Sequence, residues 1–211
     1  MEPIVAFFSI LGAVVVGAMS PGPSFVLIAR TAVARSRRDG VAAALGMGAG
    51  GGVFTVLALL GLNALLARLP WLDVGIKLAG GAYLLYLALR LWRGGGARLA
   101  APIGATPETA RRGGAFALGF TTQLSNPKTA IAYGSIFAAL LPAQPPPWLY
   151  VALPPLIFAI ETGWYTIVTL AFSADRPRGA YLRAKGWIDR FAGAVMGALG
   201  LRLILAAARR G

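Results

Sequence analysis

Residues 14–28 read VVVGAMSPGPSFVLI, which places the tetrapeptide Ser20-Pro21-Gly22-Pro23 inside a long apolar run. Further along the chain, Ser125-Asn126-Pro127-Lys128 interrupts a second apolar run that extends from Gly114 to Leu141. Proline removes a backbone donor and clashes with the preceding helical turn. In lipid, the backbone groups that it frees need partners from protein or from a water-lined cavity. The paired breaks therefore predict a site between two interrupted helices; two packing kinks without a ligand are the alternative.

The composition indicates an integral membrane protein. Of the 211 residues, 57% are hydrophobic and only 13% are charged, whereas a soluble domain carries about 25% charged residues. Apolar runs of roughly 20 residues are long enough to cross a bilayer as helices. We therefore expect an all-α integral membrane protein that contacts the lipid bilayer. A single transmembrane transporter domain should occupy residues 1–211, with no separate soluble domain.

Cysteine and histidine are both absent. Their absence excludes disulfides, thiol redox chemistry, a histidine base and Cys/His metal sites. We therefore predict no catalytic residue, no metal site and no cofactor. The net charge of +13 does not indicate nucleic-acid binding, because the basic residues gather in the links between apolar runs, where positive charge sets the orientation in the membrane.

Six spans are predicted, at about 4–28, 41–66, 73–92, 114–141, 148–174 and 188–208. The first, third and fifth links carry most of the arginines, so the positive-inside rule predicts that these links are cytoplasmic and that both termini lie outside.

The predicted spans divide into two halves of opposite orientation. Repeat 1 (about 1–92) and repeat 2 (about 114–211) would each contain three spans, joined by a basic cytoplasmic linker at about 93–113. Such a 3+3 inverted repeat is common among secondary transporters, and it places the breaks of spans 1 and 4 opposite each other.

Each break contains a residue pair that favours the start of a helix. Ser and Asn are preferred N-caps and Pro is preferred at the first helical position, so Ser20-Pro21 and Asn126-Pro127 each predict the start of a half-helix inside the membrane. Gly22 lets a ligand approach the backbone, and Pro23 reinforces the break. Two helix N-termini at one site favour an anion. Neutral hydrogen bonds are expected from polar residues around the second break, Gln123, Ser125 and Thr129.

Lys128 is costly at its predicted position. It follows a helix start, where the dipole repels a cation, and it lies near mid-span, where a lone charge costs at least ~2.5 kcal/mol. A substrate carboxylate would compensate this charge, as would Glu161, the only acidic residue in the middle of a predicted span. One interpretation is a resident Lys128–Glu161 ion pair. In the other, substrate or a proton competes for the pair, and Glu161 carries a proton inward while a zwitterion binds with its carboxylate at Lys128 and its ammonium group at Glu161.

Further residues are candidates for the pocket lining or for helix packing. Gly46 and Gly50 lie on a small-residue ridge of span 2, which suits close helix packing as well as pocket lining. Trp164 and Tyr165 lie deeper in their span than the interfacial aromatic residues and are candidates for the pocket wall. A similar ridge in span 6, Gly193 and Gly197, would pack internally or in a homodimer. Asn63, Asp73 and Lys77 are expected to be solvated near the outer interface.

Five groups of residues together match a known pattern: Pro21-Gly22-Pro23, Gly46 to Gly50, Gly80 to Leu84, Phe116 to Lys128, and Asp189-Arg190 followed by Gly193, Gly197 and Gly200. On these residues the chain resembles the LysE/RhtB family of bacterial amino-acid exporters. The resemblance implies secondary active export of amino acids or small amino-acid derivatives across the bacterial inner membrane, driven by the proton gradient. It is strongest in spans 1 to 4 and loose around Glu161, and it leaves open the substrate and the choice between proton and sodium.

Three other functions are compatible with the sequence. A carrier for metal ions or another small metabolite is one, although no acidic cluster favours a divalent cation. A membrane-embedded hydrolase would use Ser20 or Ser125 together with Lys128. A structural subunit would tolerate the loss of Lys128. We expect a transporter and not an enzyme.

Overall fold

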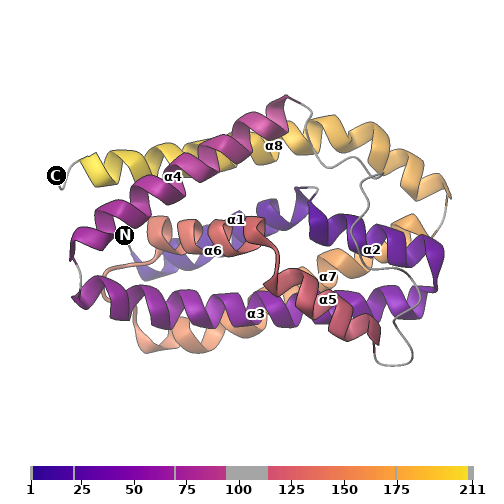
Figure 1. Ribbon diagram of the computed structural model, residues 1–211, viewed down its shortest axis with the longest axis horizontal. Helices are drawn as coiled ribbons and strands as arrows, with labels where there is room; N and C mark the ends of the chain where they lie inside the picture. Colours follow the sequence, from indigo (N-terminus) through magenta and orange to yellow (C-terminus); the bar gives the residue numbers. More distant parts are fainter. Residues whose placement is uncertain (1, 21, 69, 94–113, 174, 209–211) are drawn as a thin grey trace.

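The computed structural model describes residues 2–20, 22–68, 70–93, 114–173 and 175–208. These residues form helices and connecting turns without a strand, so the predicted all-α class is confirmed (Figure 1). The helices are α1 (Pro3–Met19), α2 (Pro23–Ala34), α3 (Arg37–Arg68), α4 (Pro70–Trp92), α5 (Gly114–Leu124), α6 (Pro127–Leu140), α7 (Pro147–Phe172) and α8 (Asp175–Ala208). Pro21 and nearly all of the predicted linker at 93–113 lie outside the described residues.

Three of these helices are long and apolar enough to cross a membrane, namely α3 over Arg37–Gly61, α7 over Pro147–Phe172 and α8 over Gly186–Ala208. α1 and α2 qualify together as a fourth span, bent by 56° at the first break. In the part of the chain that the structure describes, the helices therefore support a multi-pass membrane protein. The predicted count of six spans stays a prediction.

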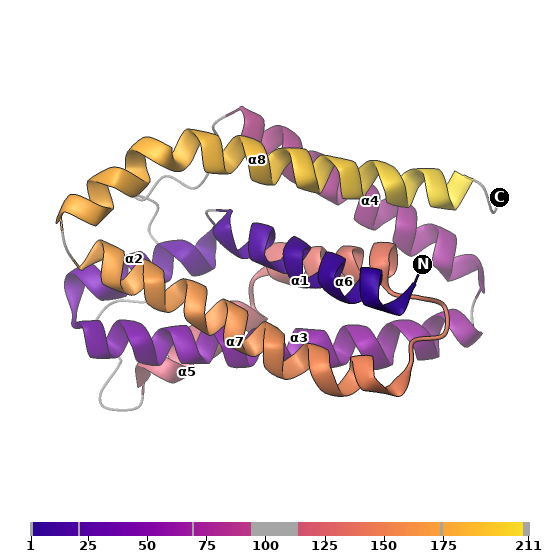
Figure 2. The same ribbon diagram turned by 180° about the vertical axis from the view of Figure 1, so that it is seen from behind.

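The helices are arranged in layers (Figures 1 and 2). α4 and α8 lie side by side in one layer, and α3 packs against α7 and α5 in the opposite layer. α1 and α6 lie between these layers, where α6 contacts α1, α3, α4 and α8. α1 begins and α8 ends at the same end of the molecule. Each broken pair, α1 with α2 and α5 with α6, has a buried polar residue at its break, Ser20 and Asn126 respectively, although Ser125 and Pro127 on either side of Asn126 are exposed.

Glycines allow the closest helix contacts. A Cβ added to Gly81 of α4 would lie 2.8 Å from the carbonyl oxygen of Gly200 in α8, and a Cβ on Gly200 would lie 2.7 Å from the Gly81 carbonyl oxygen. The ridge of α8 also packs internally, because an added Cβ at Gly193 would collide with the Trp92 ring of α4. Gly46 of α3 faces the backbone of Phe116 and Phe120 in α5 in the same way.

Two apolar clusters hold the bundle together on either side of a polar centre. One joins α1, α3, α6 and α7 and includes Ile10, Phe137 and Ile157. The other joins α2, α3 and α7 and includes Phe25 and Tyr165. Burial of such side chains contributes roughly 1.5–3 kcal/mol each in water. Along α7, the polar centre begins after the first cluster ends, at Glu161.

The first break differs from its prediction, whereas the second confirms it. Asn126 caps α6, its side chain accepts a hydrogen bond from the Lys128 backbone N–H, and Pro127 opens the helix as expected. Ser20, in contrast, ends α1 and does not start α2, which begins at Pro23 with Gly22 as its N-cap. The predicted Ser20-Pro21 start is therefore wrong. The reason is Pro23, because a proline disfavours helical backbone at the residue before it, here Gly22.

Candidate functional site

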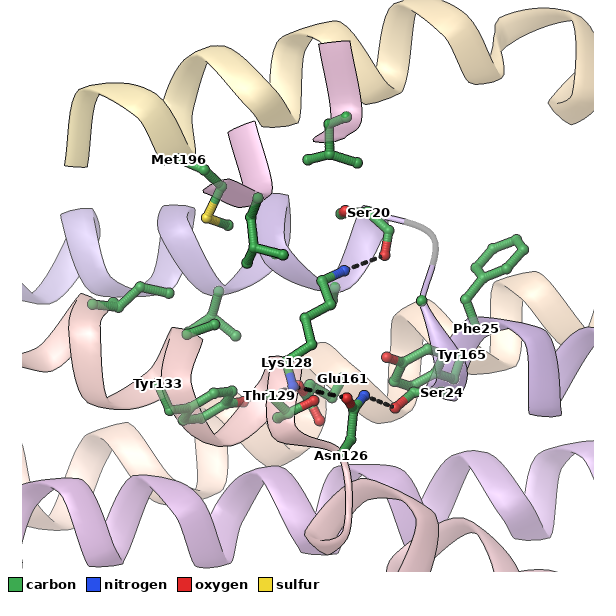
Figure 3. Close-up of a pocket in the computed structure, with 18 residues that line it drawn as sticks. Ser20, Ser24, Phe25, Asn126, Lys128, Thr129, Tyr133, Glu161, Tyr165 and Met196 are labelled. Carbon is green, nitrogen blue, oxygen red and sulfur yellow. Dashed lines mark hydrogen bonds between the residues drawn. The ribbon is translucent and has the colours of Figure 1, made fainter. Parts of the chain in front are cut away.

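The two breaks contact each other through buried polar side chains (Figure 3). Ser24, in the first turn of α2, donates a hydrogen bond from Oγ to Gln123 Oε1 of α5 at 2.7 Å. Asn126, the cap of α6, donates from Nδ2 to Ser24 Oγ at 2.9 Å. All three side chains are buried. The first turn of α2 is thus hydrogen-bonded, through Ser24, to α5 and to the cap of α6.

The same network extends to the acidic residue of α7. Glu161 is 3% exposed, and its two oxygens have different donors. Gln123 Nε2 donates to Oε2 at 2.6 Å, and the Tyr133 hydroxyl of α6 donates to Oε1 at 2.9 Å. Hydrogen bonds to an ionised group are about twice as strong as neutral ones. Gln123 therefore bridges Glu161 to Ser24, and a buried carboxylate is connected to both breaks.

Gly51 of α3 leaves the space that the Glu161 carboxyl group occupies. A Cβ at Gly51 would collide with the Glu161 carboxylate and lie 3.0 Å from the Tyr133 hydroxyl. We expect Gly51→Ala to destabilise the protein by about 1–3 kcal/mol through overpacking and to reduce transport. Gly52→Ala is the matched control: its added Cβ would meet only the Pro154 carbonyl oxygen at 3.9 Å, so it should stabilise the helix by about 0.5–1 kcal/mol. Thermal unfolding in detergent measures both changes, and equal effects would contradict the assignment.

Lys128 is held by the end of the first half-helix. Its Nζ donates to the backbone carbonyl oxygen of Ser20 at 2.8 Å, where α1 ends. A helix C-terminus carries partial negative charge and favours a cation. The buried carboxylate of Asp189 in α8 also stabilises the Lys128 cation electrostatically. Within the described residues, Lys128 and Glu161 do not form an ion pair with each other. Lys128 instead donates to the Ser20 carbonyl oxygen, and Glu161 accepts from Gln123 and Tyr133.

Lys128 and Glu161 nevertheless line the same cavity, which has a volume of about 30 Å³. One wall is polar and comes from the breaks, α6 and α7. It contains Ser20, Ser24, Asn126, Lys128, Thr129, Tyr133, Glu161 and Tyr165. The apolar wall comes largely from α1, α4, α6 and α8, with Val14, Leu87, Leu91, Ile136 and Met196. Lys128 and Glu161 are the only charged side chains among the described residues of this lining.

The structure brings many of the predicted site residues together and leaves others apart. Seven of them line the cavity: Ser20, Gly22, Asn126, Lys128, Thr129, Glu161 and Tyr165. Gln123 lies behind the lining and reaches it through Ser24 and Glu161. The remaining described residues, Pro23, Gly46, Gly50, Ser125, Pro127 and Trp164, do not line this cavity. Among these, Gly50 lies against Gln123, since an added Cβ would come within 2.7 Å of the Gln123 Cβ.

Sequence reasoning missed three residues and misplaced a fourth. Ser24 and Tyr133 stand within apolar runs without an unusual pattern, although the position of Ser24 directly after Pro23 was a signal for a helix-start residue. Asp189 was assigned to the end of the last span, yet it is 3% exposed. Lys77 was expected to be solvated, yet it is 9% exposed and buried by its neighbours. These positions depend on how α4, α6 and α8 pack, which no local pattern shows.

Known proteins match nearly the whole chain. The family model of the LysE type translocator matches residues 15–207. The threonine efflux proteins of Salmonella typhi and Escherichia coli strain K12 are 35% and 33% identical over 207 and 203 residues, and each match covers 96% of this chain and 98% of the relative. The homoserine/homoserine lactone efflux protein of Salmonella typhimurium is 30% identical over 128 residues, 60% of this chain and 61% of that protein. No solved structure shows a significant match. The protein therefore belongs to the LysE type translocator family.

Proposed function

We propose that the protein is a secondary active exporter of small uncharged amino acids across the bacterial inner membrane, coupled to inward proton movement by alternating access. One observation carries the proposal: a partly buried cation, Lys128, and a buried carboxylate, Glu161, line one cavity between two broken helices. The printed names of the relatives, which are efflux proteins for threonine and for homoserine and its lactone, support amino-acid derivatives as substrates.

The charges of the cavity suit a zwitterion. The substrate carboxylate would replace the Ser20 carbonyl oxygen as the acceptor for Lys128 Nζ, and the ammonium group would face Glu161 across the same cavity. The apolar wall leaves the substrate side chain without a charged partner among the described residues. A basic or acidic side chain would therefore be buried without compensation, which costs more than burying an uncharged one.

The size of the cavity supports alternating access. The space of about 30 Å³ suffices for two or three water molecules and not for an amino acid, because one water needs about 10–15 Å³ of such space. Substrate binding therefore requires that the two broken pairs move apart. The two breaks are positions at which the half-helices of each pair, α1 and α2 or α5 and α6, can move relative to each other.

The helix pairing supports the 3+3 inverted repeat. If α1 and α2 correspond to α5 and α6, then α3 corresponds to α7 and α4 to α8. The pairs α3–α7 and α4–α8 pack against each other, and α1 contacts α7 as α5 contacts α3. A two-fold relation between the halves would produce these contacts. The start of α1 and the end of α8 at one end of the molecule agree with an even number of spans.

One proton per cycle supplies nearly the energy that a hundredfold gradient requires. A hundredfold outward gradient of a neutral solute requires about 2.7 kcal/mol, and one proton that moves inward across ~100 mV supplies ~2.3 kcal/mol before any pH gradient. Glu161 is the proposed carrier, because it is a buried carboxylate in the cavity lining. No observation favours carriage of metal ions: in the described residues no three His, Cys, Asp or Glu side chains gather.

Counterflow in proteoliposomes tests the proposal. Vesicles loaded with unlabelled threonine should take up labelled threonine when they contain the protein and should not do so when they lack it. Lysine and glutamate, as charged amino acids, should compete poorly. Absence of exchange for threonine, serine and homoserine by folded protein would contradict the proposed function.

Gln123 should transmit a change in the charge of Glu161 to the hydrogen bonds between the two breaks, because it contacts both Glu161 and Ser24. Gln123→Leu removes the acceptor of Ser24 Oγ and one donor to Glu161. A buried polar group without its partner costs about 1–3 kcal/mol, so we expect counterflow to fall by about tenfold or more and its pH dependence to change. Leu124→Gln is the control, since Leu124 is the exposed neighbour on α5. An unchanged pH profile in Gln123→Leu would contradict the linking role.

A further inference from the structure

One side chain of the cavity has a hydroxyl group without a hydrogen-bond partner. Ser20 lines the cavity and is 3% exposed, and its Oγ has no partner among the described residues. Buried hydroxyl groups are normally hydrogen-bonded, so each exception calls for an explanation. Ser24, the next serine along the chain, has its hydroxyl group satisfied by protein: Ser24 Oγ both donates and accepts within the network.

The position of this hydroxyl relative to Lys128 is chemically informative. Lys128 Nζ donates a hydrogen bond to the backbone carbonyl oxygen of Ser20 (Figure 3). The unpaired hydroxyl group and the acceptor of the Lys128 ammonium group therefore belong to the same residue. In Ser20, two carbon atoms separate the carbonyl carbon from the hydroxyl oxygen. A β-hydroxy amino acid has the same path between its carboxyl carbon and its hydroxyl group. A ligand of this kind whose carboxylate replaces the Ser20 carbonyl oxygen at Lys128 therefore has its hydroxyl as many bonds from the bound carboxyl carbon as the Ser20 hydroxyl is from its own carbonyl carbon.

We propose that the Ser20 hydroxyl is the specificity-determining group of the cavity and that it selects amino acids with a side-chain hydroxyl group close to the carboxylate. This inference rests on the proposed amino-acid export and names the substrate class of the same site. Ser20 Oγ donates to or accepts from the substrate hydroxyl, while the carbon atoms of the substrate side chain face the apolar wall of Leu87, Leu91 and Met196.

The physical basis is the penalty for an unpaired polar group. A substrate without a hydroxyl leaves Ser20 Oγ buried and unpaired, as it is in the closed cavity. A site that pairs with a substrate hydroxyl discriminates strongly against analogues that lack it, whereas an apolar pocket discriminates weakly between groups of equal size. Threonine and valine have nearly the same shape, so a preference between them reports this one hydrogen bond.

The experiment compares threonine with valine, and serine with alanine, in counterflow by the wild type and by Ser20→Ala. The alanine variant keeps the backbone carbonyl that holds Lys128, so only the hydroxyl is tested. We expect the wild type to prefer threonine by about tenfold or more and Ser20→Ala to lower the threonine-to-valine ratio by about tenfold, because one neutral hydrogen bond is removed. Ser20→Thr keeps a hydroxyl and should keep the preference.

Ser135→Ala is the matched control. Ser135 in α6 is also buried, at 2% exposure, and its Oγ also lacks a partner among the described residues, but it does not line the cavity. This variant should retain the wild-type ratio. A ratio that is unchanged in Ser20→Ala, or lowered equally in Ser135→Ala, would overturn the role of Ser20.

The outcomes also separate this inference from the function on which it rests. Equal transport of threonine and valine by the wild type overturns the specificity role and leaves amino-acid export intact. No transport of any of the four amino acids by folded wild type overturns both. If Ser20→Ala does not fold, Ser20→Cys replaces it, and its weaker hydrogen bonding should lower the same ratio.

Discussion

Replacing Lys128 with alanine is expected to slow amino-acid transport strongly while the protein remains folded. Lys128 Nζ lies in the cavity and donates to the Ser20 carbonyl oxygen at 2.8 Å. A substrate carboxylate in its place forms a charge-assisted hydrogen bond, worth about 1.5–3 kcal/mol. Its loss corresponds to a reduction of roughly 10- to 150-fold in the rate at low substrate concentration.

Stability should change much less than transport. Removal of Lys128 eliminates the desolvation cost of a partly buried cation, which offsets the lost hydrogen bond at the end of α1. Lys128→Met, which keeps most of the apolar stem, should therefore also fold and transport slowly. Counterflow of labelled threonine measures the rate, and thermal unfolding in detergent controls for folding. Equal counterflow by the wild type and Lys128→Ala would remove Lys128 from the substrate site.

Replacing Glu161 with glutamine is expected to separate exchange from uphill transport. The glutamine side chain has nearly the same shape and keeps an acceptor for Gln123 or Tyr133, the two donors at Glu161. Because its amide group does not bind a proton in this pH range, the variant cannot couple export to proton entry. Counterflow should continue at a reduced rate. The wild type should sustain a threonine gradient of up to about a hundredfold, which one proton per cycle nearly supports, whereas Glu161→Gln should sustain almost no gradient.

The measurement is threonine accumulation in vesicles with an imposed pH gradient and membrane potential. The charged and titratable groups that face Glu161 are Tyr133 and Lys128 of α6 and Tyr165 of α7. Asp189→Asn is the comparison, because Asp189 is an equally buried carboxylate that does not line the cavity. Near-normal accumulation by Glu161→Gln, or loss of coupling in Asp189→Asn alone, would exclude Glu161 as the coupling group.

The two breaks show how far local patterns are reliable. Asn126-Pro127 carries a cap and a helix-start residue in adjacent positions, and the structure places both as predicted. Ser20-Pro21 has the same local pattern, but Pro23 competes with it and moves the start of α2 by two residues. The pattern of a capping residue before proline therefore predicted the helix start correctly where one proline was present. It failed where a second proline, Pro23, followed two residues later.

The partners of the charged residues were less predictable. Lys128 and Glu161 were identified because charges are rare and costly in apolar spans. Their actual contacts are the Ser20 carbonyl oxygen, Gln123 and Tyr133, and not the ion pair that was one of the two interpretations of the sequence. Neutral partners are abundant in the sequence, so their choice depends on which helices meet.

The sequence by itself determined that the protein is an all-α membrane protein, that two of its helices are broken, and which two charges lie near those breaks. These conclusions follow from apolar run length, from proline geometry and from the cost of charge in lipid, all of which act locally. Only the tertiary structure decided that Gln123 joins Ser24 to Glu161, that the end of α1 holds Lys128, and that the hydroxyl of Ser20, a residue of the cavity lining, has no partner among the described residues. Those contacts join residues far apart in the chain, and they depend on how the layers of helices pack.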